Sequence, residues 1–171
     1  MRATIGKIIG GLLMLTAITL VVSSTLGREI MAGKQPGLWS FSIIHFAGYL
    51  FFLLMPVEVL VPYYQLEDHP AMVLVGLSIG TAVAAQLIDY GIGRLLSERV
   101  IRLLGERKYN RLRPRIEQWG GWAIFIFNLF PLSSPNMLLV AGITRFPAGR
   151  TVVISTAGLT VKYLAIVFLF G

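Results

Sequence analysis

Five long hydrophobic runs, separated by short polar segments, make up most of the chain. They cover residues 8–22, 38–64, 71–92, 121–143 and 151–170. A helix needs about 20 apolar residues to cross a hydrocarbon core of about 30 Å, and it satisfies its own backbone hydrogen bonds inside lipid. The pattern therefore predicts an all-α integral membrane protein with no soluble domain.

Prolines divide two of these runs near their middles. Pro56 and Pro62 interrupt residues 38–64, and Pro131 and Pro135 interrupt residues 121–143. The unbroken piece 41–55 gives only about 22 Å of helix at 1.5 Å per residue, which is short of a full crossing. We therefore expect both runs to form re-entrant hairpins, which enter the membrane and return to the same side.

Residues 8–22 follow Arg2 and Lys7 and precede two serines. A cleavable signal peptide has this pattern. The rest of the chain is equally apolar, however, and this favours a retained N-terminal helix.

Residues 94–119 form a basic segment. Eight of the fifteen Lys and Arg residues lie between Arg94 and Arg115. Leu96, Val100, Leu103 and Leu104 recur at helical spacing, which predicts an amphipathic helix on the membrane surface.

The composition supports a bilayer environment. Charged residues make up 13% of the chain and the mean hydropathy is +0.75, whereas soluble domains carry about a quarter charged residues. The absence of cysteine excludes disulfides, thiolate metal sites and cysteine nucleophiles. The net charge of +7 is concentrated beside apolar runs, so the positive-inside rule explains it better than nucleic-acid binding does.

The same rule selects a topology. If every run crossed the membrane and Arg2 and Lys7 were cytoplasmic, the basic segment would lie outside, against the positive-inside rule. With two re-entrant hairpins, Glu67 and Asp68 lie outside and residues 94–118 lie in the cytoplasm. We expect a cytoplasmic (inner or plasma) membrane location.

The two halves of the chain resemble each other. Each has a proline-broken run, a turn that ends in Pro70 or Pro147, and an uninterrupted run. This order predicts an inverted repeat. We expect one membrane domain, 1–171, made of an N-terminal helix and loop (1–37), a first repeat (38–92), the basic helix (93–119) and a second repeat (120–171).

Three charged residues fall inside apolar runs. Glu58 lies between Pro56 and Pro62, where a carboxylate at membrane depth costs at least ~2.5 kcal/mol without water, a partner or a proton. It is a candidate proton carrier. Lys162 lies in the last run, where its stem can snorkel to the interface or its ammonium can pair with Glu58 or Asp89. Asp89 lies near the inner end of its run and can instead reach interfacial water or pair with Arg94.

The second proline break is rich in polar residues. Helix ends at such breaks carry unpaired backbone groups, which are tolerated where they line a cavity, and helix N-termini favour anions such as phosphate. The candidate substrate-binding residues are Asn128, Ser133, Ser134, Asn136, Arg145 and Arg150. His45 and His69 have no carboxylates nearby at metal-ligand spacing, so we expect both to be structural. We expect no metal, no cofactor and no enzymatic activity.

Several motifs together resemble the DedA family, also called the VTT or SNARE-associated superfamily. Residues 56–62 (PVEVLVP) are similar to its P-[SG]-E-x-x-x-P signature, and residues 89–94 (DYGIGR) look like the end of its GDxxGYxIGR motif. Residues 130–136 and 141–147 resemble its second re-entrant loop and the segment that follows. The resemblance covers residues 41 to the end in matching order.

The resemblance implies two opposed re-entrant hairpins and transbilayer lipid movement, either flipping of undecaprenyl phosphate or scrambling of phospholipid, with protons as the driving ion. Glu58 corresponds to a functional carboxylate. This chain departs from the family at four positions. The family's Asp falls on Gln86 and an earlier family Glu falls near Tyr49, and the family's two loop arginines fall on Asn128 and Ser134. These departures favour a divergent scramblase or a small-solute exporter over proton-coupled undecaprenyl-phosphate transport.

Together these features predict a membrane transport protein that moves lipid between leaflets. The expected partners are membrane lipids with anionic headgroups, protons and a second copy of the chain. Two alternatives stay open: a small-solute or ion exporter on the same fold, and a non-transport assembly factor that docks a partner through its basic helix.

Overall fold

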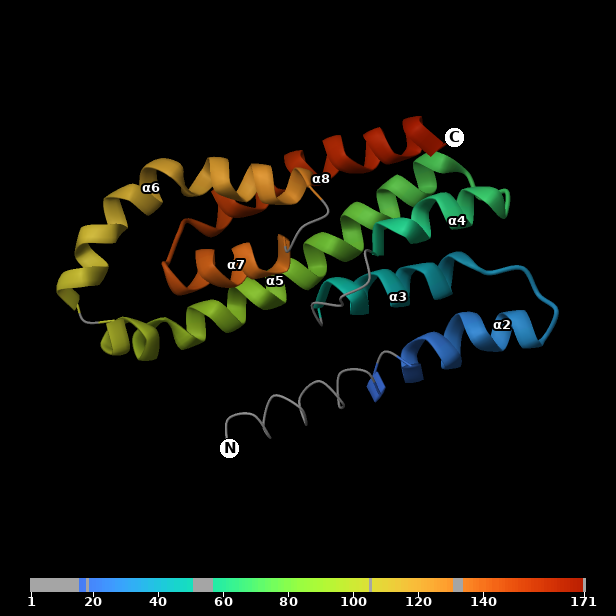
Figure 1. Ribbon diagram of the computed structural model, residues 1–171, viewed down its shortest axis with the longest axis horizontal. Helices are drawn as coiled ribbons and strands as arrows, with labels where there is room; N and C mark the ends of the chain where they lie inside the picture. Colours follow the sequence, from blue (N-terminus) through green and yellow to red (C-terminus); the bar gives the residue numbers. More distant parts are fainter. Residues whose placement is uncertain (1–15, 18, 51–56, 105, 131–133, 171) are drawn as a thin grey trace.

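The computed structural model describes residues 16–170 except 18, 51–56, 105 and 131–133, and this part is helical without strands. The elements are the π-helical η1 (Ser23–Gly27), α2 (Arg28–Met31), α3 (Leu38–Leu50), the 3₁₀-helical η2 (Val57–Val59), α4 (Leu60–Leu66), α5 (Ala71–Leu104), α6 (Glu106–Leu129), α7 (Ser134–Ile143) and α8 (Ala148–Phe170). They form an elongated bundle with α5 running along its length (Figure 1). Most of the predicted N-terminal helix lies outside the described residues.

Each interrupted run contains two helices within the described residues, and Pro56 and Pro131 themselves lie outside those residues. In the first, α3 ends at Leu50 and η2 begins at Val57. In the second, α6 ends at Leu129 and α7 begins at Ser134. Since α3 has 13 residues and α7 has 10, they are about 20 Å and 15 Å long.

The basic segment differs from the expectation of one separate amphipathic helix. α5 continues past the apolar run to Leu104, and residues 106–119 form the first part of α6. The reason is local: residues 93–104 contain no proline, and Leu, Arg and Glu propagate a helix well. With 34 residues, α5 is about 51 Å long, so it exceeds a bilayer core.

α6 joins the second part of the basic segment to the apolar residues that follow. It carries Pro114 inside its 24 residues, and Figure 1 shows the helix curving in this first half. Proline removes one backbone hydrogen bond and clashes with the preceding turn, which bends a helix. The curvature turns the apolar half of α6 back over α7 and α8.

The order of elements repeats along the chain. α3, η2 with α4, and α5 are matched by α6, α7 and α8, and Pro147, before α8, lies 77 residues after Pro70, before α5. The turns match as well, since Asp68 and Arg145 both have positive φ, at 63° and 57°.

The hydrogen bonds of the two turns are also equivalent. Asp68 N donates to Gln65 O at 3.1 Å, and Arg145 N donates to Gly142 O at 3.1 Å. The following amides, of His69 and Phe146, each donate to the carbonyl five residues earlier, at 3.2 Å and 2.9 Å. This is the Schellman arrangement, which ends a helix on a left-handed residue.

These two turns lie at opposite ends of the bundle. The turn from α4 to α5 lies at the right-hand end of Figure 1, and the turn from α7 to α8 lies toward its left-hand end. At the right-hand end, His69 Nε2 lies 2.6 Å from Pro36 O, so the turn contacts the loop that precedes α3. At the other end, Trp119 of α6 and Phe146 of the turn line one cavity.

Close backbone contact joins α5 to α7. A Cβ on Gly93 would overlap the carbonyl oxygen of Leu139, and one on Gly142 would overlap that of Tyr90. Ser97 Oγ adds a hydrogen bond to Ile143 O at 2.8 Å. Only glycine at both positions allows this approach, which is a common way for membrane helices to pack.

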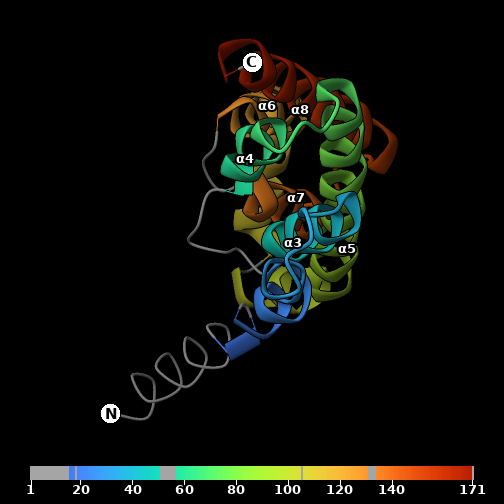
Figure 2. The same cartoon turned by 90° about the vertical axis from the view of Figure 1, so that its right-hand side faces the viewer.

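Two hydrophobic clusters fill the bundle. The larger includes Phe41, Val61, Leu74 and Leu159, from α3, α4, α5 and α8. The smaller includes Ile124 and Leu138, from α6 and α7. The view along the bundle shows α3, α4, α7 and α8 grouped beside α5 (Figure 2).

Two described helices are long and apolar enough to cross a membrane by length and composition, 71–99 in α5 and Ala148–Phe170 in α8. In the apolar 18-residue stretch of each of these helices, only 33% is buried within the molecule. Large apolar side chains stay exposed on them, including Leu95 (84%) and Phe168 (90%). A core helix of a soluble protein is mostly covered, so this exposure is consistent with membrane association.

Candidate functional site

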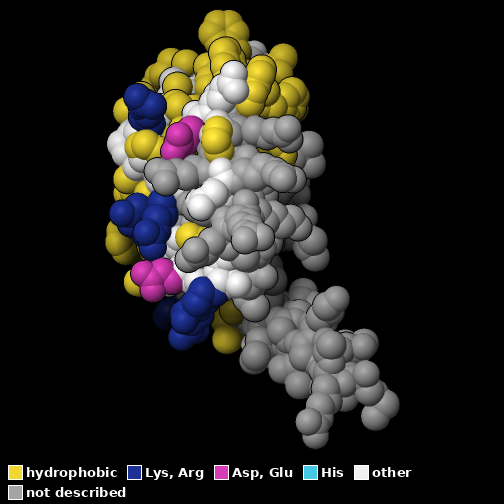
Figure 3. Space-filling view, turned by 90° about the vertical axis from the view of Figure 1, so that its left-hand side faces the viewer, with side chains coloured by type: hydrophobic (Ala, Val, Ile, Leu, Met, Phe, Trp, Pro, Cys, Tyr) yellow, Lys and Arg dark blue, Asp and Glu magenta, His cyan; other side chains and the backbone are white. Residues whose placement is uncertain are grey.

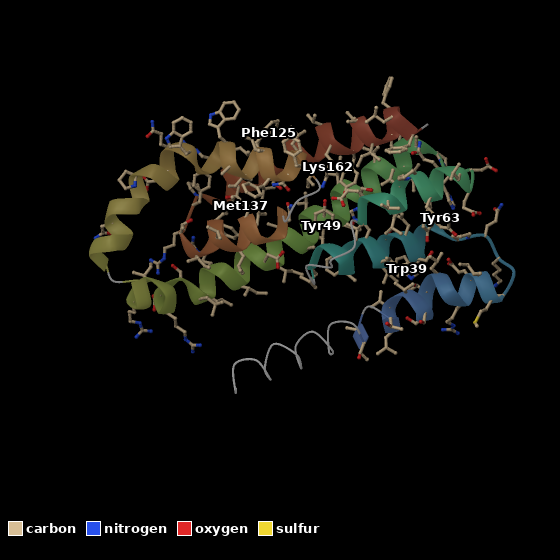
Figure 4. All side chains as sticks on the ribbon, viewed as in Figure 1. Trp39, Tyr49, Tyr63, Phe125, Met137 and Lys162 are labelled. Atoms are coloured by element: carbon tan, nitrogen blue, oxygen red, sulfur yellow. The ribbon has the colours of Figure 1, made fainter. Side chains whose placement is uncertain are left out.

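A buried ion pair lies at the centre of the bundle. Lys162 Nζ of α8 is 2.7 Å from Glu58 Oε1 of η2, and the two side chains are 3% and 14% exposed. Lys162 Nζ also donates to Tyr49 OH of α3 at 2.6 Å. Figure 4 shows Lys162 and Tyr49 in the middle of the bundle, between α8 and α3. The sequence allows Lys162 to snorkel to the interface or to pair with Glu58 or Asp89, and the structure has the pair with Glu58.

Aromatic rings surround the ammonium group. Lys162 Nζ lies 5.3 Å from the ring centroid of Tyr49 and 5.0 Å from that of Tyr163. Both distances are within the range of cation–π attraction, which strengthens when water is excluded. The carboxylate, the hydroxyl and the two rings compensate for the lost hydration of the lysine.

Hydrogen bonds extend from the ion pair across the bundle. Tyr49 OH lies 2.9 Å from Tyr163 OH, and Tyr163 OH lies 2.8 Å from His45 Nε2. His45 Nδ1 in turn lies 2.7 Å from Thr81 Oγ1 of α5. We call Glu58, Lys162, Tyr49, Tyr163, His45 and Thr81 the central polar chain. It connects α3, η2, α5 and α8.

The last bonds of the central polar chain have a defined direction. Thr81 donates its hydroxyl hydrogen to Leu77 O at 2.7 Å, so its oxygen must accept from His45 Nδ1. A neutral imidazole donates from one nitrogen and accepts at the other, and burial beside Lys162 favours the neutral form. His45 Nε2 therefore accepts from Tyr163 OH.

The directions of the first bonds in the central polar chain follow from the same count of donors and acceptors. Because Tyr163 donates to the imidazole, its oxygen accepts from Tyr49 OH. Tyr49 OH is closer to Tyr163 OH, at 2.9 Å, than to Glu58 Oε1, at 3.4 Å, and it accepts from Lys162. Every bond from the ammonium to Leu77 O thus points the same way, an arrangement in which protons can shift stepwise along a chain.

A second buried polar group surrounds Asn128, one of the predicted site residues. Gln86 Nε2 donates to Asn128 Oδ1 at 2.6 Å, and Asn128 Nδ2 donates to Ile124 O at 2.8 Å. Ser155 Oγ donates to Gln86 Oε1. All three side chains are at most 1% exposed. These bonds join α5, α6 and α8, so Asn128 is a structural link between helices here.

Asp89 is buried and lies apart from the lysine. It is 2% exposed, and its Oδ2 has no hydrogen-bond partner among the described atoms. Arg94 donates instead to Tyr90 OH, at 3.3 Å. Neither of the pairings considered for Asp89, with Lys162 or with Arg94, is present in the described part of the chain.

The two predicted arginines lie near the turn between α7 and α8. Arg145 Nε donates to Ser97 Oγ at 3.2 Å, and its Nη2 lies 3.5 Å from Glu98 Oε1. Arg150 is exposed in the first turn of α8. Among the other predicted residues, Ser133 lies outside the described residues, and so do the side chains of Ser134 and Asn136.

Sequence reasoning missed four members of the central polar chain. Tyr49, Tyr163 and Thr81 lie in apolar runs, where single hydroxyl groups resemble ordinary core positions, and His45 was expected to be structural. A signal was available in retrospect, since Tyr49 and His45 are four residues apart and therefore share a helix face. His69 has the structural role expected of it, through Pro36 O.

Within the described residues, no group of three or more His, Cys, Asp or Glu side chains is placed to hold a metal ion. The central polar chain contains one carboxylate and one imidazole, which face different partners. The chemistry that the arrangement supports is charge pairing and proton transfer inside an apolar bundle.

Comparison with known proteins gives no relative. No protein-family model, no curated protein and no solved structure matches the chain.

Proposed function

We propose that this chain is a membrane transport protein that moves phosphate-bearing lipid between the leaflets of a bilayer, and that the headgroup passes the Glu58–Lys162 pair. The observation that carries the proposal is this buried ion pair, joined to a hydrogen-bonded chain, within helices whose outer faces are apolar. Intramembrane ionisable pairs are costly and mark substrate or proton paths in transporters.

The geometry of the two broken runs supports re-entrant hairpins. The described parts of α3 and α7, with 13 and 10 residues, are shorter than a helix that crosses a core of about 30 Å. The loop before α3 and the turn after α4 meet at one end of the bundle, through His69 and Pro36. This contact supports a first hairpin that starts and finishes on one side of the membrane.

An inverted repeat places the second hairpin on the opposite side. The α7–α8 turn lies at the other end of the bundle from the α4–α5 turn (Figure 1). Figure 3 views the end where α5 stops and α6 starts, and Lys and Arg side chains with interspersed Asp and Glu lie along one side of it. By the positive-inside rule this end is cytoplasmic, in an inner or plasma membrane.

Lys162 provides the phosphate-binding charge in this proposal. An ammonium can pair with a carboxylate or with a phosphate. In this structure the ammonium of Lys162 is paired with the carboxylate of Glu58. Protonation of Glu58 removes the competing charge and frees Lys162 for a headgroup. When Glu58 releases that proton, Tyr49 OH can accept it and pass its own proton to Tyr163, which passes one to Nε2 of the neutral His45. This route favours a proton-linked flippase over a passive scramblase.

The resemblance to the DedA family points to the same function, because its signature carboxylate falls on Glu58. Two of the family charges that this chain lacks fall on Gln86 and Asn128, whose side chains are hydrogen-bonded to each other between α5 and α6. Lys162 is the charge available to a headgroup in this central region of the described chain.

The experiment is reconstitution of the full chain into vesicles that contain a trace of fluorescent phospholipid. Chemical quenching of the outer leaflet measures lipid movement, and a dye trapped in the same vesicles measures solute leakage. We expect lipid movement above that of protein-free vesicles with the dye retained. Solute flux without lipid movement would instead identify a small-solute exporter, and neither activity would favour an assembly factor.

A further inference from the structure

A groove between α6 and α8 lies on the outer surface of the bundle. Its volume is about 500 Å³, and its apolar lining includes Trp122, Phe125, Val153, Ile154 and Ala157. Trp122 and Val153 are 64% and 69% exposed. Figure 4 shows Phe125, which lines this groove, on α6 and Met137 on α7. Met137 lines a smaller groove of about 240 Å³ between α6 and α7.

On a membrane-spanning α8, this groove faces the hydrocarbon core of the bilayer. Val153 and Ala157 begin a stripe of exposed apolar residues that continues along α8 through Val161 (47%), Leu164 (37%) and Phe168 (90%). A stripe at this spacing covers one face of a helix. An acyl chain, which is apolar and about as wide as a side-chain groove, is the occupant that fits this face.

One end of the groove is polar and positively charged. Arg150, the third residue of α8, lines it. The first amides of a helix lack intrahelical partners and attract anions. A Cβ built on Gly149 meets nothing within 4 Å, so space is open beside these amides. An arginine and a helix N-terminus together match a phosphate group.

The depth of this end in the bilayer agrees with a headgroup. α8 starts at Ala148 and is 23 residues long, which is about one membrane thickness, so Arg150 lies at the interface. Trp122 lines the same groove, and Trp119, one turn earlier, is 62% exposed. Exposed tryptophans gather at the headgroup level of membrane proteins.

We infer that the groove between α6 and α8 binds one phospholipid, with an acyl chain along the groove and the phosphate at Arg150. This binding site goes beyond the proposed transport, because it lies outside the central polar chain and is occupied whether or not lipid crosses. Glu117 also lines the groove, so the site recognises the phosphate and tolerates a zwitterionic headgroup.

Native mass spectrometry of the full chain in detergent tests the inference. The probes are phosphatidylglycerol, phosphatidylcholine and diacylglycerol with identical acyl chains. We expect the two phospholipids to be retained about tenfold more than diacylglycerol, since a charge-assisted contact to phosphate is lost. Equal retention of diacylglycerol would overturn the phosphate assignment.

Matched variants locate the binding. Arg150→Gln removes the cation and Ala157→Phe fills the groove, and each should lower phospholipid retention about tenfold. Arg102→Gln changes an exposed arginine at the end of α5, and Val140→Phe adds the same ring to the smaller groove, so both should retain lipid as the wild type does. Unchanged binding in Arg150→Gln and Ala157→Phe contradicts the site. The assay involves no transport, so it can fail while the transport proposal stands.

Discussion

Lys162 interrupts a helix that is otherwise apolar, and its environment shows how such a residue is accommodated. The ammonium contacts a carboxylate and a phenol from two other helices. At 4% exposure, the side chain does not reach an interface as a snorkelling lysine does. Its charge therefore depends on Glu58, and the two residues are energetically coupled.

This coupling gives a prediction at the residue scale. Lys162→Met leaves the Glu58 carboxylate buried without its partner, and removing one member of a buried pair costs about 3 kcal/mol. Glu58→Gln combined with Lys162→Met removes both charges, so much of that loss should be recovered. Unfolding of Lys162→Met, Glu58→Gln and the double variant in detergent, each compared with wild type, measures this coupling. Additive effects, with the double variant least stable, would show that the pair is absent.

At the element scale, the contact between α5 and α7 depends on two glycines. Gly93 and Gly142 each face the backbone of the other helix, with no room for a Cβ. The neighbouring Tyr90 OH donates to Phe146 O at 2.7 Å, which also ties α5 to the turn after α7. These contacts hold α7 and the turn after it against the long helix α5.

Substitution of these glycines tests the contact. Gly93→Ala should destabilise the protein by about 2 kcal/mol, because overpacking separates the helices, although alanine favours the helix itself. Gly76→Ala is the matched control, since a Cβ there meets nothing within 4 Å, and it should leave stability unchanged or raise it by up to about 1 kcal/mol. Thermal unfolding compares them, and equal midpoints would contradict the close approach.

Elements were predictable from the sequence where backbone chemistry determines them. The end of α6 at Leu129, two residues before Pro131, follows from the missing amide hydrogen of proline and its clash with the preceding turn. The extent of α5 was not predictable in this way, because residues 93–104 change the polarity of the helix surface without changing its backbone preference. From the sequence alone, the change from apolar to basic side chains at Arg94 predicts the start of a separate helix.

The site was predictable only in part, for a related reason. Glu58 and Lys162 are unusual in apolar runs, so the cost of their burial identified them and suggested their pairing. Tyr49, Tyr163 and His45 are common in helix cores, and only their three-dimensional arrangement reveals a chain. Asn128 was identified as polar, but its partner Gln86 lies 42 residues away in the sequence.

At the scale of the whole molecule, the inverted repeat that we propose relates α3 to α5 with α6 to α8. The two matching turns lie at opposite ends of the bundle, and the Glu58–Lys162 pair lies between them (Figures 1 and 4). Transporters with inverted repeats place their substrate sites midway between the two halves. Under this proposal, one site faces either side of the membrane in turn, as the two halves exchange roles.

The topology has its own test, because the chain contains no cysteine. Single cysteines at Lys34, Glu67, Arg102 and Gly149 can be labelled with a reagent that does not cross membranes. Residues 34 and 67 should react from outside the cell, and residues 102 and 149 only after the membrane is opened. If 34 and 67 instead react from opposite sides, the first broken run crosses the membrane and is not re-entrant.

The most direct measurement of the central claim is the initial rate of phospholipid movement by wild type and Glu58→Gln in the same vesicles, with and without a pH gradient. Asp68→Asn is the control, since it removes an exposed carboxylate at a left-handed position that asparagine also adopts. We predict that the gradient accelerates wild type and Asp68→Asn. Glu58→Gln leaves Lys162 free to bind a headgroup but has no negative charge to displace it again, so this variant should lose both the gradient response and most of the movement. Wild-type rates and an intact gradient response in Glu58→Gln would contradict the account.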